Sequence, residues 1–527
     1  MFLATFNFIK EKRTLLLILI QLVAAIILSS IITIWIDEAY TLNTTSKGIG
    51  YAFTQAIGFE GQPPLYFVLV AAWRIISKSI FWARMFSILS ISISILYVHY
   101  ISKQFVNQLN AFLITLLFAL HPVVTWAAIE IRPYALLIMF CAMNIYYFTK
   151  YCTNPDTKNR IKYIIVAVLG LFTHYYFGFI LLANGVYLLI KDRKFFFKKY
   201  IVDMIVPLVF LIAFAKLIIA NTSLHVNNFN SDRSDLDIPN FIRYRIEYYT
   251  ILNPELNLRG WGANMYKIIF GVFIFIVLML QAQNGSFKKL FQNWKKVLAS
   301  GPGKNHVKKI VIISKNGLPL NYYLIISLVL LFCMSLVYWI LGQFFVSMRY
   351  NVILLLPLFI LFSSAMFSII PWKKIFWIFA SILLIIYTIA NYKTNYKFKD
   401  SISEIAKFFN KEEKPNEPIF IYRNTEALVF SYYYHGINRM FPLPGEFSFE
   451  TYDVKNSVIE NKEEGLKTLE YRLLPGTKKF WLVYDHASPY NIAFNQQEFA
   501  TYVSSKYTLE KDTMIYGITL HKYIVNK

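Results

Sequence analysis

The stretch from Leu15 to Trp35 reads LLLILIQLVAAIILSSIITIW, and the carboxylates of Asp37 and Glu38 follow it almost directly. An α-helix needs about 20 predominantly apolar residues to cross the hydrocarbon core of a bilayer. Basic residues precede this run, as in a signal peptide, but the run is long and no small-residue cleavage site follows it. We therefore expect a retained first helix that carries two adjacent carboxylates at its far end.

The composition is typical of a membrane protein. Hydrophobic residues make up 57% of the 527 residues and charged residues only 16%, whereas soluble domains carry about 25% charged residues. The formal net charge of +23 taken alone would suggest nucleic-acid binding, yet the lysines and arginines fall in short clusters between apolar runs. Cytoplasmic loops of membrane proteins carry such clusters, so no nucleic-acid partner is expected. The three cysteines form no CxxC pair or disulfide pattern.

Apolar runs of spanning length recur along the chain. Spans are predicted near residues 15–36, 82–102, 110–129, 134–151, 161–174, 176–190, 200–220, 264–283, 320–342, 350–370 and 374–391. The apolar run 64–80 is short and contains Arg74 and Lys78, so we interpret it as an interfacial helix in the outer leaflet. With this interpretation every basic cluster falls in a loop on the same side of the membrane. The sequence therefore predicts about eleven spans and a cytoplasmic N-terminus.

The predicted fold is mainly α: a polytopic transmembrane helical bundle with a small extracytoplasmic α/β domain at its C-terminus. The bundle comprises residues 1–391, with an outer loop at 37–81 that holds interfacial helices and a second outer loop at 221–262. The domain comprises residues 392–527, where acidic and basic residues nearly balance. We expect a helix at 400–411 and strands at 418–422, 479–484 and 515–524, with turns at 442–445 and 475–476.

The same topology places several polar residues at outer helix ends, where they can meet in one cavity. Asp37, Glu38 and Glu130 supply carboxylates for acid–base chemistry or metal binding. Guanidinium groups match phosphate geometry through paired hydrogen bonds, and the candidates are Arg132, Arg243, Arg245, Arg259 and Arg349. Simpler interpretations exist: helix-end carboxylates, a local Glu130–Arg132 pair, a headgroup anchor at Arg349 and a solvated basic loop.

Several short motifs carry a family resemblance. Asp37-Glu38-Ala39-Tyr40, Gln62-Pro63-Pro64-Leu65-Tyr66, Arg84, Glu130-Ile131-Arg132-Pro133-Tyr134, His174-Tyr175 and Arg349-Tyr350 occur in this order. Together they resemble the C-type membrane glycosyltransferases, most closely the protein O-mannosyltransferase and aminoarabinose-transferase branch, over residues 15–370. The resemblance implies a polyprenyl-phosphate-dependent enzyme that moves one sugar to an acceptor hydroxyl at the outer face of the membrane. The acceptor, an envelope lipid, glycan or protein, stays open.

The resemblance also implies roles for individual residues. Asp37 falls on the acidic residue of the family and is expected to act as the base, with Glu38 and Glu130 also catalytic. The arginines, Arg349 above all, are expected to hold the donor phosphate. The expected substrate-binding residues are Glu60, Gln62, Tyr134, His174 and Tyr175. For the histidine an interfacial structural role is an equal alternative, and tyrosines at such positions are more often interfacial anchors than sugar contacts.

One motif departs from the aminoarabinose transferases. They carry a Glu-Lys pair directly before Pro-Pro, whereas Glu60-Gly61-Gln62-Pro63-Pro64 has an added glycine and a glutamine in place of the lysine. Phosphate binding by this loop is therefore in doubt. No cofactor is required by the sequence, although a divalent cation could bind Asp37, Glu38 or Glu60.

A transporter or flippase of lipid-linked sugars is the main alternative function, because it would also bury charges in the membrane. Such proteins usually contain inverted repeats and helices broken at mid-membrane depth, which the sequence lacks. We therefore expect a multi-pass enzyme of the plasma membrane, in contact with membrane lipid, whose C-terminal domain is extracytoplasmic.

Overall fold

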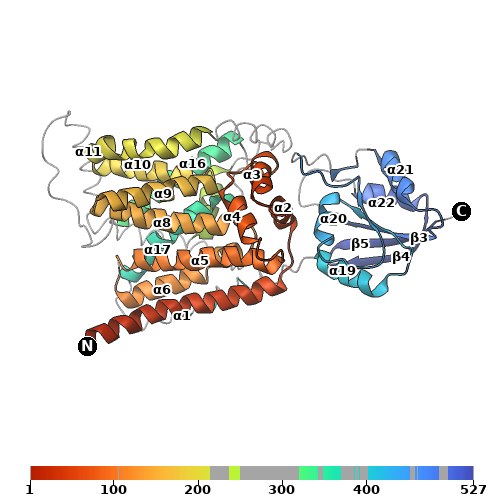
Figure 1. The fold of residues 1–527 in the computed structure, drawn as a ribbon, viewed down its shortest axis with the longest axis horizontal. Coiled ribbons are helices and arrows are strands. Elements are labelled where there is room, and N and C mark those ends of the chain that lie inside the picture. Colours follow the sequence, from red (N-terminus) through yellow and green to blue (C-terminus); the bar gives the residue numbers. More distant parts are fainter. Residues whose placement is uncertain are drawn as a thin grey trace. The chain divides into compact units, whose positions relative to one another are not determined.

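The computed structural model describes residues 2–104, 106–213, 237–249, 320–341, 348–369, 381, 385, 388, 391, 401–450, 457–459, 461–485 and 496–525. The chain folds into two compact units (Figure 1). The helical unit contains the residues up to Ser30 and most of those between Gln62 and Lys397. The mixed unit contains Ile31–Gly61 and the residues from Phe398 onward. The predicted span 264–283 lies outside the described residues, as do most of the span 374–391 and the predicted outer loop 221–262 apart from residues 237–249.

The helical unit is built from helices that follow the apolar runs of the sequence. They are α1 (Phe2–Ile31), α4 (Leu65–Trp73), α5 (Ile80–Ser102), α6 (Gln108–Ala119), α7 (Pro122–Ile129), α8 (Tyr134–Thr153), α9 (Thr157–Thr173), α10 (Phe177–Lys191), α11 (Arg193–Phe195), the π-helix η1 (Phe196–Tyr200), α13 (Ile238–Tyr249), α16 (Leu320–Leu341), the 3-10 helix η4 (Met348–Leu354) and α17 (Leu355–Ile369). Residues 201–213 are also helical. The mainly helical fold predicted from the sequence is confirmed.

Three of the described helices are each long and apolar enough to cross a membrane: Ile80–Ser102, Tyr134–Thr153 and Asn321–Leu341. Two bent pairs, Leu16–Ile31 with Ile36–Thr44 and Gln108–Ala119 with Pro122–Ile129, raise the number to five if each pair is one span. The count of about eleven spans remains a prediction.

One predicted span, 110–129, is broken in the middle. Its two halves, α6 and α7, meet at an angle of 55°. Pro122 is the first residue of α7 and has no N–H for the preceding turn. His121 caps the new helix, because its Nδ1 accepts a hydrogen bond from the Val123 amide at 3.3 Å. The proline and its cap account for the break.

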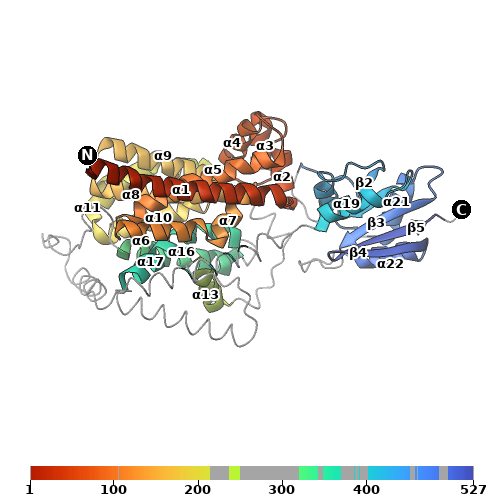
Figure 2. The ribbon, with the colours of Figure 1, turned by 90° about the horizontal axis from the view of Figure 1, so that it is seen from below.

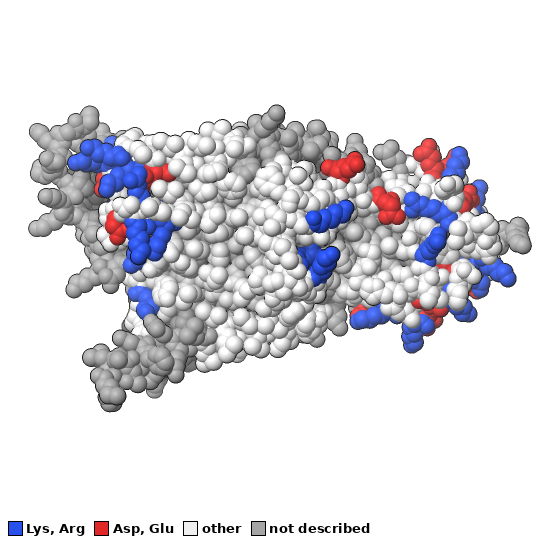
Figure 3. Space-filling model, in the orientation of Figure 1, with Lys and Arg blue, Asp and Glu red and all other residues white. Residues whose placement is uncertain are grey.

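The ends of the helical unit differ in charge. Basic residues gather around the end of α8, the start of α9 and the segment α11–η1, at the end where Figure 1 labels α11, and Figure 3 shows the surface beside them largely free of charge. A helix of 20 residues is about 30 Å long. Helix α8 ends and α9 begins at this basic cluster. The other ends of these two helices, Tyr134 of α8 and Thr173 of α9, therefore lie at the opposite end of the unit.

The mixed unit contains a five-stranded sheet with the order β2-β1-β3-β5-β4. Its strands are β1 (Ile419–Tyr422), β2 (Met440–Leu443), β3 (Lys479–Asp485), β4 (Thr508–Ile515) and β5 (Ile518–Ile524), and its helices are α2 (Ile36–Thr44), α3 (Ile49–Gly58), α19 (Ser401–Glu412), α20 (Asn424–Phe430), α21 (Lys462–Arg472) and α22 (Gln496–Ser504). Strand β1 pairs in parallel with β2 and β3, and β5 pairs antiparallel with β3 and β4.

Helices cover both faces of this sheet, because successive side chains of a strand point to opposite faces. Phe420, Phe480 and Leu482 belong to the core formed with α21 and α22. On the other face, Phe409 of α19 lies edge-on against Trp481, with ring centroids 5.3 Å apart. The mixed unit is therefore a small α/β layer structure, as the sequence predicts.

The last predicted strand, 515–524, corresponds to β5, which begins three residues later than predicted and is the second strand of a hairpin. Strand β4 ends at Ile515 and β5 begins at Ile518, and the two residues between them, Tyr516 and Gly517, both have positive φ. The sequence did not predict β4, because most of its side chains are exposed and its residues are therefore mostly polar rather than alternating polar and apolar.

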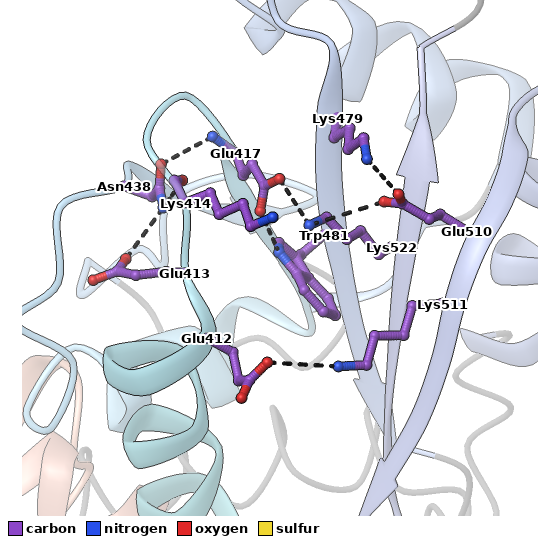
Figure 4. A network of polar contacts seen from close by, with 10 residues as sticks. All are labelled: Glu412, Glu413, Lys414, Glu417, Asn438, Lys479, Trp481, Glu510, Lys511 and Lys522. Atoms are coloured by element: carbon purple, nitrogen blue, oxygen red, sulfur yellow. Dashed lines mark hydrogen bonds and ion pairs between the residues drawn. The ribbon is translucent and has the colours of Figure 1, made fainter.

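An ionic network crosses the sheet face that α19 covers (Figure 4). The Lys522 ammonium lies 2.7 Å from Glu417 Oε1, and the Trp481 indole N–H donates to Glu417 Oε2 at 3.3 Å. Lys479 hydrogen-bonds Glu510 and lowers the pKa of that carboxyl below its ordinary value. The network joins three neighbouring strands to the segment before β1.

Candidate functional site

The segment between α7 and α8 presents the first group of predicted site residues. α7 ends at Ile129, Glu130 takes an extended conformation, and Pro133 begins the first turn of α8. The Glu130 carbonyl accepts a hydrogen bond from Ser87 Oγ of α5 at 2.5 Å. Glu130 and Arg132 are only 8% and 5% exposed. A buried carboxylate and a buried guanidinium two residues apart are thus held at the end of the unit opposite the basic cluster.

An aromatic cluster surrounds this segment. Tyr134 stacks on Trp126 with centroids 5.3 Å apart and lies 6.3 Å from the ring of Tyr350 in η4. His174, which follows α9, has its ring 5.9 Å from Tyr350, and Tyr176 lies 6.4 Å from the same ring. Tyr350 therefore links the ends of α8 and α9 to η4, three helix ends that are far apart in sequence.

His174 is fixed by the turn between α9 and α10. Its Nδ1 accepts a hydrogen bond from the Tyr176 amide at 3.2 Å, so its Nε2 is the ring nitrogen left for other contacts. The imidazole is 5% exposed, and the positive charge of Arg132 is near enough to act on it. His174 and Arg132, predicted separately from the sequence, thus share one environment.

The predicted arginines have different surroundings. The Arg349 guanidinium lies 5.8 Å from the ring of Tyr350. Arg245 is buried and lies 3.9 Å from the Phe241 ring of its own helix, α13, which packs against η4, α16 and α17 (Figure 2). Arg243 is exposed on the same helix. Arg259 lies outside the described residues.

Arg84, which contributed to the family resemblance, is 1% exposed on α5 and donates to the Ser29 carbonyl of α1 at 2.8 Å. This contact joins two long helices. Gln62 is half-buried, and its Oε1 accepts no hydrogen bond from the part of the chain that the structure describes.

The remaining predicted carboxylates belong to the mixed unit. Asp37 and Glu38 occupy the first turn of α2, where negative charge is favoured by the helix dipole. Glu38 is 1% exposed, and its Oε2 accepts a hydrogen bond from the Trp35 amide at 3.3 Å. Asp37 is half-buried. Glu60, after α3, accepts a hydrogen bond from Thr44 Oγ1 at 3.2 Å and so joins the two short helices.

Two aromatic members of the first group were not among the residues predicted from the sequence. Trp126 lies one helical turn before the buried Glu130, and Tyr176 lies two positions after the buried His174. Within the described ranges no three His, Cys, Asp or Glu side chains gather as metal ligands. The possible divalent cation at Asp37, Glu38 or Glu60 stays a prediction.

Comparison with known proteins supports the resemblance. Residues 61–219 match the family model of the dolichyl-phosphate-mannose-protein mannosyltransferases. This segment contains Gln62, Glu130, Arg132 and His174, whereas Asp37 and Arg349 lie outside it. The chain thus resembles the protein mannosyltransferase branch of the C-type membrane glycosyltransferases, as predicted from the sequence.

Solved structures that match the chain include ArnT from Cupriavidus metallidurans in the apo state, with 12% identity, a TM-score of 0.47 and 98% of each chain covered. The same protein bound to undecaprenyl phosphate matches with a TM-score of 0.45 at 12% identity, over 96% of this chain and 97% of that chain. The archaeal oligosaccharyltransferase AglB from Archaeoglobus fulgidus, in complex with an inhibitory peptide and a dolichol-phosphate, matches at 11% identity and a TM-score of 0.39. This match covers 89% of this chain and 69% of the AglB chain. The search of curated sequences gives no match.

Proposed function

We propose that this protein is a membrane glycosyltransferase that transfers one sugar from a polyprenyl-phosphate donor to an acceptor hydroxyl at the outer face of the plasma membrane. The observation that carries the proposal is the burial of Glu130, Arg132 and His174 together at the end of the helical unit opposite its basic cluster. Ionisable groups buried at membrane depth are costly and usually functional. The family match over residues 61–219, which contains the three residues, supports sugar transfer as the reaction of this cluster.

In the proposed reaction Asp37 takes the proton of the acceptor hydroxyl. The hydroxyl oxygen attacks the anomeric carbon, the bond from that carbon to the phosphate oxygen breaks, and polyprenyl phosphate leaves as an anion. Attack opposite the leaving group inverts the anomeric centre. A carboxylate base of this kind contributes about 10²–10⁴-fold to the rate.

Arginines support the leaving group. Because the departing phosphate is already an anion, it needs positive charge rather than a proton. We assign this role to Arg349 and Arg132, since fixed cations in a site without water stabilise developing charge strongly. Arg245 is a further candidate, whereas exposed Arg243 fits the solvated loop better. Tyr134, His174 and Tyr175 would contact the sugar.

Asp37 and Glu38 are expected to differ in role. Glu38 accepts the Trp35 amide and is almost fully buried, so it shapes the start of α2. Asp37 is half-buried and accessible to a substrate. We therefore assign the base to Asp37 and a supporting role to Glu38.

The test is the Asp37→Asn variant in proteoliposomes, with a panel of polyprenyl-phosphate hexoses and pentoses and with envelope lipids, glycans and proteins as acceptors. We expect release of polyprenyl phosphate to fall by about 10²–10⁴-fold, while binding of undecaprenyl phosphate is retained. Glu450→Gln, an exposed carboxylate in the same unit, should match the wild type. Undiminished turnover in Asp37→Asn would remove this residue from the mechanism. Movement of donor across the membrane without sugar transfer would favour a flippase.

A further inference from the structure

The short helix α2, which carries the proposed base, and its neighbour α3 depend on other parts of the mixed unit. α2 has 9 residues and α3 has 10. Isolated helices shorter than about 12 residues are marginal in water, so tertiary contacts must hold Asp37 in place. Those contacts come from the C-terminal part of the chain, where Tyr433, the hydrogen-bond partner of Ile34, lies 399 residues later in sequence.

An aromatic contact fixes the first turns of α2. Tyr40, three residues after Asp37 and so on the same helix face, is 6% exposed. Its ring stacks on Phe447 at 5.1 Å with an interplanar angle of 23° and meets Phe59, which directly follows α3, edge-on at 5.2 Å. Phe449 packs against Phe59 at 5.2 Å. The segment after β2 thus holds both helices by their aromatic side chains.

A hydrogen bond fixes the chain just before α2. The Ile34 amide donates to the Tyr433 hydroxyl at 2.6 Å, and α2 packs against α20, the helix that precedes Tyr433. Asp37 therefore lies between two attachment points, Ile34 and Tyr40, and each is bound by a residue from the C-terminal domain.

We propose that the C-terminal domain positions the catalytic carboxylate, with Phe447 and Tyr433 as positioning residues. The inference rests on the proposed function of Asp37. Misplacement of a reacting group by about 1 Å can cost about 10²-fold in rate. Loss of the Phe447 ring should therefore lower kcat and leave KM for the donor nearly unchanged, because the donor phosphate is assigned to arginines of the helical unit.

The experiment compares Phe447→Ala and Phe447→Tyr in the full chain, reconstituted in lipid nanodiscs. Hydrogen exchange of the peptide 36–45 and kcat with a polyprenyl-phosphate hexose or pentose are measured on each. We expect Phe447→Ala to speed exchange in this peptide at least tenfold and to lower kcat about 10–10²-fold. Phe447→Tyr keeps the stacked ring and should restore both values. Tyr433→Phe, which removes the acceptor of the Ile34 amide, should speed exchange at residues 34–37.

Phe441→Ala is the matched control. Phe441 stacks on Phe420 at 5.3 Å in the same domain, so its loss removes a similar aromatic contact away from α2. We expect unchanged exchange in the peptide 36–45 for this variant. Equal effects of the two alanine variants would mean general destabilisation and would overturn the proposal, as would unchanged exchange in Phe447→Ala.

Failure of this inference is distinguishable from failure of the proposed function. If Asp37→Asn turns over normally while Phe447→Ala still loosens α2, the assignment of the base is wrong but the attachment of α2 stands. If Asp37→Asn is inactive while Phe447→Ala changes neither exchange nor kcat, only the positioning role is refuted.

Discussion

Lys522 and Glu417 form an ion pair that is almost fully removed from solvent, with side chains 9% and 7% exposed. The pair has no place in the proposed chemistry, and the Trp481 indole adds a hydrogen bond and a cation–π contact to it (Figure 4). Because a buried charge without its counter-charge is costly, each residue needs the other even if the pair itself adds little stability.

We expect Lys522→Met to destabilise the C-terminal domain by about 3–5 kcal/mol, since Glu417 would remain buried without its cation. Hydrogen exchange of the β3 and β5 peptides measures this loss. The double variant Lys522→Met, Glu417→Gln removes both charges and should recover most of the stability. A double variant as unstable as the single one would show that the lysine acts by packing rather than by charge.

At the level of elements, α9 and α10 meet closely on either side of the turn that holds His174. Gly170 of α9 faces Phe177 of α10, and a Cβ at Gly170 would meet the ring of Phe177. Phe177 is fully buried, so its ring cannot move into solvent. The absence of a side chain at Gly170 thus sets the approach of the two helices and the place of the turn.

We expect Gly170→Ala to cost about 1–3 kcal/mol through overpacking and to lower transferase turnover, because the turn with His174 and Tyr176 must shift. Thermal unfolding and the rate of polyprenyl phosphate release are the measurements. Gly178→Ala is the matched control, since its Cβ would lie 3.5 Å from Leu171 in ordinary contact. Equal tolerance of both substitutions would contradict this account of the helix crossing.

For the whole molecule, the distribution of charge predicts orientation. The basic residues at the end of α8 and the start of α9 are expected on the cytoplasmic side, and the C-terminal domain on the other. Lys158, near the start of α9, is exposed, and Tyr471 of the C-terminal domain is 91% exposed, so a reagent can reach either position.

A cysteine introduced at each of these two positions tests the prediction, with the half-buried Cys152 replaced by serine and the buried Cys141 and Cys333 retained. A membrane-impermeant maleimide should label Tyr471→Cys in intact cells and Lys158→Cys only in inverted vesicles. Labelling of both from the same side would contradict the topology, and with it the outer location of the proposed site.

The sequence by itself determined that the fold is mainly helical, because a long apolar run is a local property. The membrane side of the basic loops, inferred in the same local way, remains a prediction. The sequence also predicted which polar residues lie at helix ends, and the family model supports the resemblance over residues 61–219. It missed the break at Pro122 within an unbroken apolar run and the hairpin at Gly517, whose strand β4 is mostly polar.

Only the tertiary structure decided which residues meet. Tyr350, His174 and Tyr134 lie far apart in sequence, and their rings come together because three helices end at the same place. The attachment of α2 to the C-terminal domain joins distant segments, since Ile34 and Tyr433 are 399 residues apart. Such contacts depend on packing between elements, which no local pattern of residues encodes.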